Sequence, residues 1–442
     1  MYYIVEVKLN ILFLTIFPTI IRSPPVYLSS KLVACGCNEN ILVWNVTTGQ
    51  RVALLRGKNS PVTFISGRPG ASNELACGYQ DGTVGMWSLQ QEDEPLVLLH
   101  GHKRHVAVLV WNESGTRLAS GGGDCDVIVW DAVDQCGLYR LKGHKERVTS
   151  LAFVNNNDDA FVLSASADRT LKLWRLATQH CEVTNVHHRA QINSMCVVGD
   201  LVWCGSDDPQ LRVFRLSFGS LDEETASEAR ISYYGAVNRS HTDRTTFVMA
   251  IDNLIISHGT RNAIDVWILN TDEEIKKRTK KRLKKLKRER SDETEKEVEI
   301  DESVILQDRV KNNHLNPLTI NSSGKLRGLD ALKTGPGQYR LVAAQSSNQI
   351  HVHKMTVSSD AQIDSSSLGK ISLPGHREAP RAVQFSADNR ALVTGSDAIK
   401  VWSVESCKCV RTVPMAQPIT CVEYCSGKLR VNRFYNFDRH ID

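Results

Sequence analysis

The sequence of 442 residues lacks the short motifs that mark the common classes of enzyme. It has no His-Glu-x-x-His pair that could hold a catalytic zinc ion, and no Gly-x-Ser-x-Gly turn that would expose a serine nucleophile. The stretch Ser322-Ser323-Gly324-Lys325 lacks the upstream glycine and the preceding strand of a phosphate-binding loop. We therefore expect no enzymatic activity, no cofactor and no small-molecule substrate.

The sequence also lacks the regularly spaced cysteine pairs of a secreted scaffold. None of its 12 cysteines lies between Cys204 and Cys407, and most of the others lie inside strand patterns, where a free thiol behaves as a small apolar side chain. Three short spacings have no histidine or second cysteine pair at the distance of a zinc site: Cys35 and Cys37, Cys407 and Cys409, and Cys421 and Cys425. We expect no metal site and a reducing, intracellular compartment.

Long hydrophobic runs are also scarce. The apolar stretch 9–17 resembles the hydrophobic region of a secretory signal, but it is too short to span a membrane comfortably. Glu6 precedes it, and no small-residue cleavage site of good quality follows. A strand that completes a ring of sheets, or a wrongly assigned first exon, accounts for it better than a true signal does. We treat residues 1–30 as an atypical N-terminal segment and expect no membrane partner.

Tryptophan, by contrast, recurs at a fixed interval. Trp44, Trp87, Trp130 and Trp174 are 43, 43 and 44 residues apart, and each ends a run of alternating apolar residues. A period of this length, with tryptophan at the end of a strand, is typical of WD-repeat β-propellers, whose blades each contain four strands. The sequence therefore predicts an all-β fold, a rigid ring of blades whose loops are free to bind partners.

Two repeats contain a complete set of polar residues that could form a buried hydrogen-bond network. The two sets are His102, Ser120, Asp124 and Trp130, and His144, Ser164, Asp168 and Trp174. Buried polar groups need partners, and the histidine can bond both the aspartate and the serine while the serine reaches the indole N–H. A catalytic Ser-His-Asp triad is the alternative, but an active site would not repeat with the blades. We predict a structural role for both sets.

Seven positions that end a third strand can be counted before the pattern is interrupted. They are Trp44, Trp87, Trp130, Trp174, Phe214, Trp267 and His353. A serine-rich stretch follows, and Gly375-His376 then opens a further repeat that ends at Trp402. An eight-bladed ring is one possible closure. We favour a seven-bladed propeller over 31–355, a linker over 356–374, and one orphan blade of an incomplete second propeller over 375–442, as in a truncated version of a longer protein.

The formal net charge of +5 at pH 7 is unevenly distributed. The segment 276–290 contains eleven lysines and arginines and one acid, a local charge of +10, so the rest of the chain carries about −5. These cations are Lys276, Lys277, Arg278, Lys280, Lys281, Arg282, Lys284, Lys285, Lys287, Arg288 and Arg290. They lie in an expected insertion over 272–312, which we place between blades.

Two interpretations of this basic insertion are open. It could be a solvated loop that folds back on the acidic stretch 292–302 that follows it. It could instead be an arm that binds RNA phosphates or directs nuclear and nucleolar import, since clustered cations gain affinity by releasing counterions. No aromatic residue interrupts the cations, so such an arm would bind the RNA backbone rather than the bases.

Three stretches are unusual among WD repeats. They are 126–131 with 136–144, then 178–181, and 274–285 directly after a blade that ends with Val266-Trp267-Ile268-Leu269. In this combination the chain is similar to the WD-repeat protein three family, over roughly residues 31–431 and most closely over 101–269. That resemblance implies two consecutive seven-bladed propellers and a C-terminal helical domain. Most of the second propeller and the whole helical domain are missing from this sequence, and the first thirty residues do not match.

The resemblance also implies a function. Members of the family are subunits of the UTP-B complex within the small-subunit processome, which assembles around U3 small nucleolar RNA and matures 18S ribosomal RNA. The expected partners are therefore other WD-repeat subunits of UTP-B, U3 RNA and pre-ribosomal RNA, and the expected location is the nucleus and nucleolus. The alternative is a WD-repeat adaptor, such as a substrate receptor of a ubiquitin ligase or a signalling scaffold.

Overall fold

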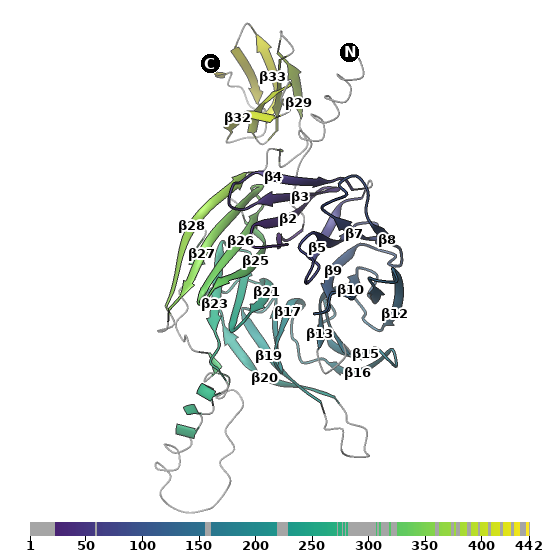
Figure 1. Cartoon of the computed structure of the whole chain (residues 1–442). Coiled ribbons are helices and arrows are strands. Elements are labelled where there is room, and N and C mark those ends of the chain that lie inside the picture. The colour runs from purple at the N-terminus through teal and green to yellow at the C-terminus, as the bar shows by residue number, and fades with distance from the viewer. Residues whose placement is uncertain are drawn as a thin grey trace, which may run out of the picture.

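The computed structural model describes residues 23–57, 60–154, 161–218, 229–271, 325–358, 362–372, 375–376, 381–386, 390–396, 398–404, 408–415, 419–425, 428–433 and 439–441. Within the segment 272–324 it describes 273–275, 277–278, 280–281, 306, 309–310 and 318–319. Across these residues, seven four-stranded antiparallel sheets follow one another along the chain and stand around a common axis (Figure 1). The fold is a seven-bladed β-propeller followed by two further sheets.

Each blade consists of four consecutive strands. Blade one contains β1 (Val26–Tyr27), β2 (Leu32–Cys37), β3 (Asn40–Asn45) and β4 (Arg51–Leu55), and blade two contains β5 (Val62–Gly67), β6 (Glu74–Tyr79), β7 (Val84–Ser88) and β8 (Val97–Leu99). Blade three contains β9 (Val106–Trp111), β10 (Arg117–Gly122), β11 (Asp126–Asp131) and β12 (Cys136–Lys142), and blade four contains β13 (Val148–Val154), β14 (Phe161–Ser166), β15 (Leu171–Arg175) and β16 (His180–Asn185).

The remaining three blades complete the ring. Blade five contains β17 (Ile192–Val198), β18 (Leu201–Ser206), β19 (Gln210–Ser217) and β20 (Arg230–Asn238), and blade six contains β21 (Thr245–Ile251), β22 (Leu254–Gly259), β23 (Ala263–Ile268) and β24 (Leu318–Thr319). Blade seven contains β25 (Leu326–Gly335), β26 (Gln338–Gln345), β27 (Gln349–Val357) and β28 (Ile363–Ser372). All seven predicted third-strand ends lie in the third strand of their blade, as the repeat spacing predicted.

The alternation of apolar residues in the third strands has a direct physical use, which β11 illustrates. Val127 and Val129 pack toward blade four, in a cluster with Trp174, whereas Ile128 and Trp130 pack toward blade two. Successive residues of a strand point to opposite faces, so a strand with neighbours on both sides must be apolar on both. Each blade thus covers a face of the next, and the core is a series of apolar layers between blades rather than a single central mass.

The ring closes between blades seven and one. Val33 and Cys35 of blade one pack with Val342 and Ile350 of blade seven in one buried cluster. The Tyr27 backbone N–H donates a hydrogen bond to Asp330 Oδ2 at 2.6 Å, and the Arg340 guanidinium donates to the Ser30 carbonyl at 2.7 Å. No strand is exchanged between the two blades, because every sheet of the ring is built from consecutive strands.

A glycine makes this closure possible. A Cβ atom added at Gly328 would lie 2.5 Å from the Cα atom of Pro24, a distance at which the backbones would have to separate. The residues from Ser23 onward therefore belong to the first blade, and Ser23 Oγ accepts a hydrogen bond from the Gly36 N–H at 2.8 Å. The N-terminal segment predicted over 1–30 is too long by these residues, and positions 1–22 lie outside the described part of the chain.

The predicted linker over 356–374 is wrong. Its serine-rich sequence forms β28, the outermost strand of blade seven, and Ser365, Ser366 and Ser367 pair with Met355, Lys354 and His353 of β27. The outer strand of a blade has one edge and much of its surface in solvent, so it needs no apolar alternation to be stable. Its exposed, polar composition therefore resembled that of a linker.

The placement of the basic insertion between blades is also wrong. The segment connects β23 to β24, the third and fourth strands of blade six, whose pairing includes Ile264 with Leu318 and Ala263 with Thr319. A connection between the outer strands lies at the rim of the ring, where an insertion displaces no packed side chains. Figure 1 shows the first helical turns of this segment extending away from the ring.

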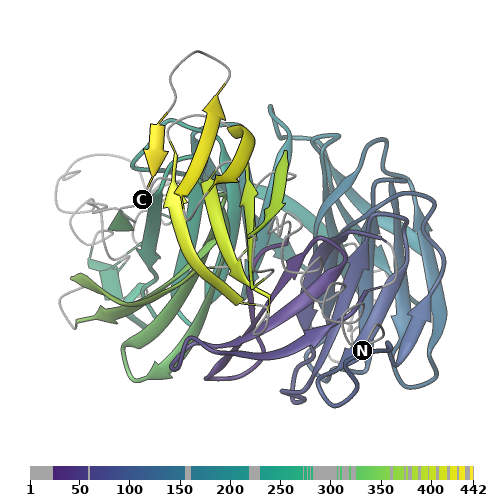
Figure 2. The same cartoon turned by 90° about the horizontal axis from the view of Figure 1, so that it is seen from above.

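Beyond blade seven, two more sheets lie outside the ring at its rim (Figures 1 and 2). One contains β29 (Ala382–Phe385), β30 (Ala391–Gly395), β31 (Ala398–Ser403) and β32 (Lys408–Pro414), and the other contains β33 (Ile419–Cys425), β34 (Lys428–Arg433) and β35 (Arg439–Ile441). The first is the predicted orphan blade, with Trp402 on its third strand. The sequence does not predict the three-stranded sheet, because the repeat pattern fades after Arg430.

We predict that Asp330 makes the stability of the ring depend on pH. Burial raises the pKa of this carboxyl to about 7, against the lowering effect of the N–H groups of Tyr27 and Ala331. The folded chain therefore holds a proton that the unfolded chain releases above about pH 4, so stability falls as pH rises from about 4 to 7, by up to about 1.4 kcal/mol per pH unit. Asp330→Asn should remove this slope.

The measurement is thermal unfolding of the wild type and the variant at several pH values, compared as a difference. Asp134→Asn, at an exposed turn of blade three, is the matched control and should leave the slope unchanged. An Asp330→Asn protein that loses stability with pH as steeply as the wild type would contradict this role of Asp330.

Candidate functional site

The predicted polar sets of blades three and four come together in the same geometry. His102 Nδ1 lies 2.9 Å from Asp124 Oδ1, His102 Nε2 lies 2.7 Å from Ser120 Oγ, and the Trp130 indole N–H donates to Ser120 Oγ at 2.8 Å. The corresponding distances from His144 to Asp168, from His144 to Ser164 and from Trp174 to Ser164 are 2.9, 2.7 and 2.8 Å. Each network ties the loop before the inner strand to the third strand.

Burial argues against a nucleophilic role for the two serines. Ser120 and Ser164 are both fully buried, and each hydroxyl already interacts with a histidine and an indole. A nucleophile must reach the substrate, whereas these hydroxyls have no open side. The hydrogen bonds instead satisfy polar groups that would be costly to bury alone.

The Asp168 carboxylate is held in its ionised form. Burial raises its pKa, but hydrogen bonds from the Thr170 hydroxyl, the Lys145 N–H and His144 more than offset this and bring the pKa to about 2. Burial lowers the pKa of His144 despite the carboxylate beside it. Near neutral pH the network therefore consists of a carboxylate and a neutral imidazole.

The structure contains related networks that sequence reasoning did not single out. In the sheet after the ring, His376 Nε2 lies 2.6 Å from Thr394 Oγ1, which accepts the Trp402 indole N–H at 2.8 Å. The Gly375-His376 pair is the sequence signal for this network, in which Thr394 takes the place of the serine found in blades three and four. In blade two the Trp87 N–H donates instead to the Tyr79 hydroxyl at 3.0 Å, a substitution that the sequence pattern does not reveal.

The base of the basic insertion is fixed to the ring on both sides. Leu269 pairs with Val310, and the Asn270 N–H donates to the Arg309 carbonyl at 2.8 Å. Leu306 and Val310 are buried in one cluster with Trp267 of blade six and Tyr234 of blade five. The segment therefore leaves and re-enters the ring at adjacent, packed positions.

The first turn of the insertion is helical and capped. The Thr271 N–H donates to Glu274 Oε2 at 3.1 Å, which is half of a capping box. The Ile275 N–H donates to the Thr271 carbonyl at 3.0 Å and forms the first helical hydrogen bond. Ile275 is buried, while Lys277, Arg278, Lys280 and Lys281 are exposed in helical conformation. The other predicted cations, Lys276, Arg282, Lys284, Lys285, Lys287, Arg288 and Arg290, lie outside the described residues.

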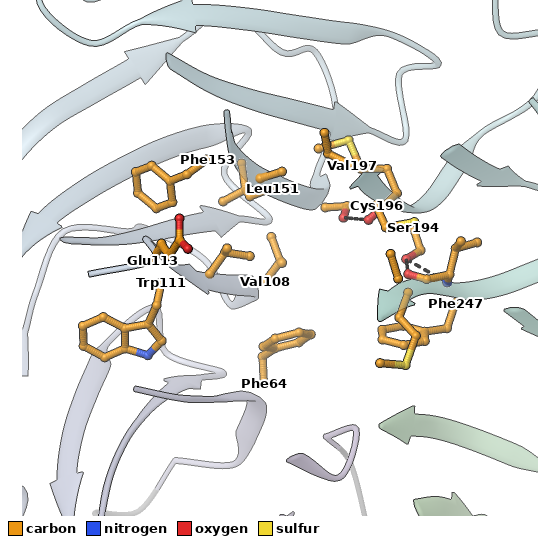
Figure 3. A pocket seen from close by; sticks show the side chains of 17 residues that line it. Phe64, Val108, Trp111, Glu113, Leu151, Phe153, Ser194, Cys196, Val197 and Phe247 are labelled. Carbon is orange, nitrogen blue, oxygen red and sulfur yellow. Dashed lines mark hydrogen bonds between the residues drawn. The ribbon is translucent and has the colours of Figure 1, made fainter. Parts of the chain in front are cut away.

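The inner strands of the ring enclose an apolar opening of about 510 Å³ at one end of the central channel (Figure 3). It is lined by side chains from β5, β9, β13, β17 and β21, among them Phe64, Phe153, Val197 and Phe247. Glu113 is the one ionisable acid among the lining residues. This end of the channel offers contacts to apolar groups but no set of acid, base and nucleophile.

The described positions contain no group of three or more histidine, cysteine, aspartate or glutamate side chains that could hold a metal ion. Among them there is also no helix with the length and apolar character needed to cross a membrane.

The comparisons with known proteins agree with this fold. Residues 31–216 match the WDR3 first beta-propeller domain, and residues 368–403 match the WD domain, G-beta repeat. A computationally designed protein, Ika8, is similar in structure, with a TM-score of 0.51 over 88% of this chain and 99% of its own at 20% sequence identity, which shows the fold alone. The chain is a WD-repeat β-propeller protein.

Similar curated proteins point to a narrower group. The U3 small nucleolar RNA-associated protein 12 of Saccharomyces cerevisiae is 28% identical over 89% of this chain and 42% of its own length. The WD repeat-containing protein 3 of Mus musculus is 29% identical over 43% of this chain and 21% of its own. The chain thus spans less than half the length of these relatives. Over residues 31–216 it is similar to the first propeller of WDR3 proteins.

We predict that Asp168→Ala destabilises the ring by about 2–3 kcal/mol, since it leaves the buried His144 and the Lys145 N–H without their acceptor. The check is the shift of the thermal unfolding midpoint. Asp134→Ala removes an exposed turn carboxylate of the same size and should change it little. Equal shifts for the two variants would rule out a special role for the Asp168 network.

Proposed function

We propose that this chain is a non-enzymatic scaffold in ribosome biogenesis that takes part in the maturation of small-subunit ribosomal RNA within the small-subunit processome. The observation that carries the proposal is its similarity, along 89% of the chain, to a protein named for its association with U3 small nucleolar RNA. The proposed location is the nucleus and nucleolus. The proposed partners are WD-repeat subunits of the UTP-B complex, U3 RNA and pre-ribosomal RNA.

The geometry of the basic insertion supports this proposal. Its described cations are exposed, and its base is fixed between blades five and six by buried side chains. A charged segment held in this way can reach an RNA backbone while the ring occupies a fixed place in an assembly. Phosphate contacts of this kind require only charge and reach, which is what the lysine and arginine run supplies.

The proposed role of the polar sets in blades three and four is to stabilise the blades. They hold the loops on one face of the ring in place, so that the loops present a constant surface to partner proteins. This is the function that a propeller performs through shape rather than chemistry.

We predict that replacing the cations of 276–290 with glutamine disperses a tagged protein from nucleoli and reduces its co-purification with U3 RNA. In vitro, the affinity of the wild type for single-stranded RNA should fall with salt. The variant should show a shallower dependence, by about 0.7 in the log–log slope for each RNA phosphate that it no longer neutralises. Fluorescence microscopy, RNA co-purification and binding at several salt concentrations provide the three readouts.

The matched control replaces only the lysines of this segment with arginine, which keeps the charge and should preserve all three readouts. If the wild type is diffuse in the cytoplasm and co-purifies with cullin-type ligase subunits instead of U3 RNA, the protein is an adaptor and the scaffold proposal is wrong.

A further inference from the structure

The end of the channel opposite the apolar opening carries polar and cationic side chains. The residue immediately before the inner strand of blades three to seven is, in order, His105, Arg147, Gln191, Arg244 and Lys325. These inner strands run side by side around the axis, so equivalent positions of the blades lie around one mouth of the channel (Figure 1). The repeat of the fold thus places several cations at one rim.

Two of these cations line a pocket of about 400 Å³ at that mouth. Arg147 and Arg244 share it with Gln191, Asn193 and Asp207, and the rest of the lining is Ala107, Val148, Thr149 and Thr246. Both arginines are exposed, and neither guanidinium forms a hydrogen bond or ion pair with another described residue. Their charge is therefore available to a ligand.

The other polar groups of the pocket are already fixed. Asn193 Nδ2 donates to Asp207 Oδ1 at 2.8 Å and to the Thr245 carbonyl at 2.8 Å, and the Thr149 hydroxyl donates to the Ile192 carbonyl at 2.8 Å. The Thr246 hydroxyl donates to the Gly259 carbonyl at 3.1 Å. A rigid polar floor with two free guanidinium groups at its edge is an arrangement that binds an oxygen-rich anion.

We propose that this pocket binds the phosphorylated serine or threonine side chain of a partner protein. Two planar guanidinium groups match the oxygens of a phosphate, and clusters of arginine are the usual means of recognising such side chains. Asp207, the single carboxylate in the lining, repels negative charge, so a carboxylate side chain binds here less well than a doubly charged phosphate. This binding goes beyond the scaffold role proposed above, since it assigns a regulated contact to the ring itself.

Two observations favour a protein ligand over RNA. The lining of the pocket contains no aromatic side chain on which a base could stack, so RNA could contact it only through its phosphates. The chain also enters the basic insertion from the other face of the ring. Because the strands of a blade alternate in direction, the segment after the third strand leaves the ring at the end opposite the start of the inner strand.

The test measures the binding of a short phosphoserine peptide with alanine and glycine neighbours to the full chain at low salt. The same peptide without the phosphate, inorganic phosphate and an octauridine RNA serve as competitors. We expect the phosphopeptide to bind at least about tenfold more tightly than its unphosphorylated form. Arg147→Ala and Arg244→Ala should each weaken this binding about tenfold.

Asp207→Asn provides a change of opposite sign. It keeps an oxygen acceptor for Asn193 but removes the one negative charge of the pocket, so it should tighten phosphopeptide binding severalfold. Arg51→Ala removes an exposed arginine from the outer strand β4 and should have no effect. Because the side chains of Arg147 and Arg244 are exposed, and alanine keeps the Arg147 carbonyl that accepts from Ser166 and Ala167, their variants should unfold at the wild-type temperature.

Several outcomes would overturn the proposal. Phosphopeptide binding that survives both arginine substitutions would place the site elsewhere. Octauridine that binds through Arg147 and Arg244 where the phosphopeptide does not would assign the mouth to RNA. If inorganic phosphate binds as tightly as the phosphopeptide, the pocket is a site for small anions and not for a phosphorylated protein.

Discussion

The packing of each blade against both of its neighbours is the constraint on which the rest of the structure depends. A four-stranded sheet on its own has two apolar faces and cannot bury either, and the alternating residues of β11 show how the ring solves this, with one face given to blade two and the other to blade four. The arrangement is stable only when the first and last sheets also meet. The hydrogen bonds of Tyr27 with Asp330 and of Ser30 with Arg340, together with the apolar cluster between blades seven and one, make this last contact.

The features that repeat from blade to blade could be predicted from the sequence, whereas features found in a single blade could not. The repeat spacing located every third strand of the ring, also in the two blades where phenylalanine or histidine replaces tryptophan, because that strand is buried on both faces. The Gly-His, serine and aspartate offsets placed the polar sets of blades three and four within hydrogen-bond distance. The outer strand β28 resembles a linker in sequence, because solvent exposure leaves its serines without an apolar pattern. Pairing of Tyr79 with Trp87, and of blade seven with blade one, depends on long-range geometry that no local spacing encodes.

The basic insertion could be predicted from the sequence, whereas the pocket lined by Arg147 and Arg244 could not, because only the first is contiguous in the chain. A run of cations is conspicuous in any sequence, although its position within blade six could be recognised only from the pairing of Ala263 with Thr319. The polar mouth is hidden, because Arg147 and Arg244 are 97 positions apart and ordinary in composition. Only the register of the blades, which starts an inner strand directly after each of them, brings them into one pocket.

The two sites have a fixed relation because the ring between them is rigid. The base of the basic insertion is held by Leu306 and Val310 on one face, and the loops at the cationic mouth are held by His102 and His144 on the other. Under the two proposals above, the RNA backbone and the phosphorylated partner bind at different places on the ring, so they do not compete for one site.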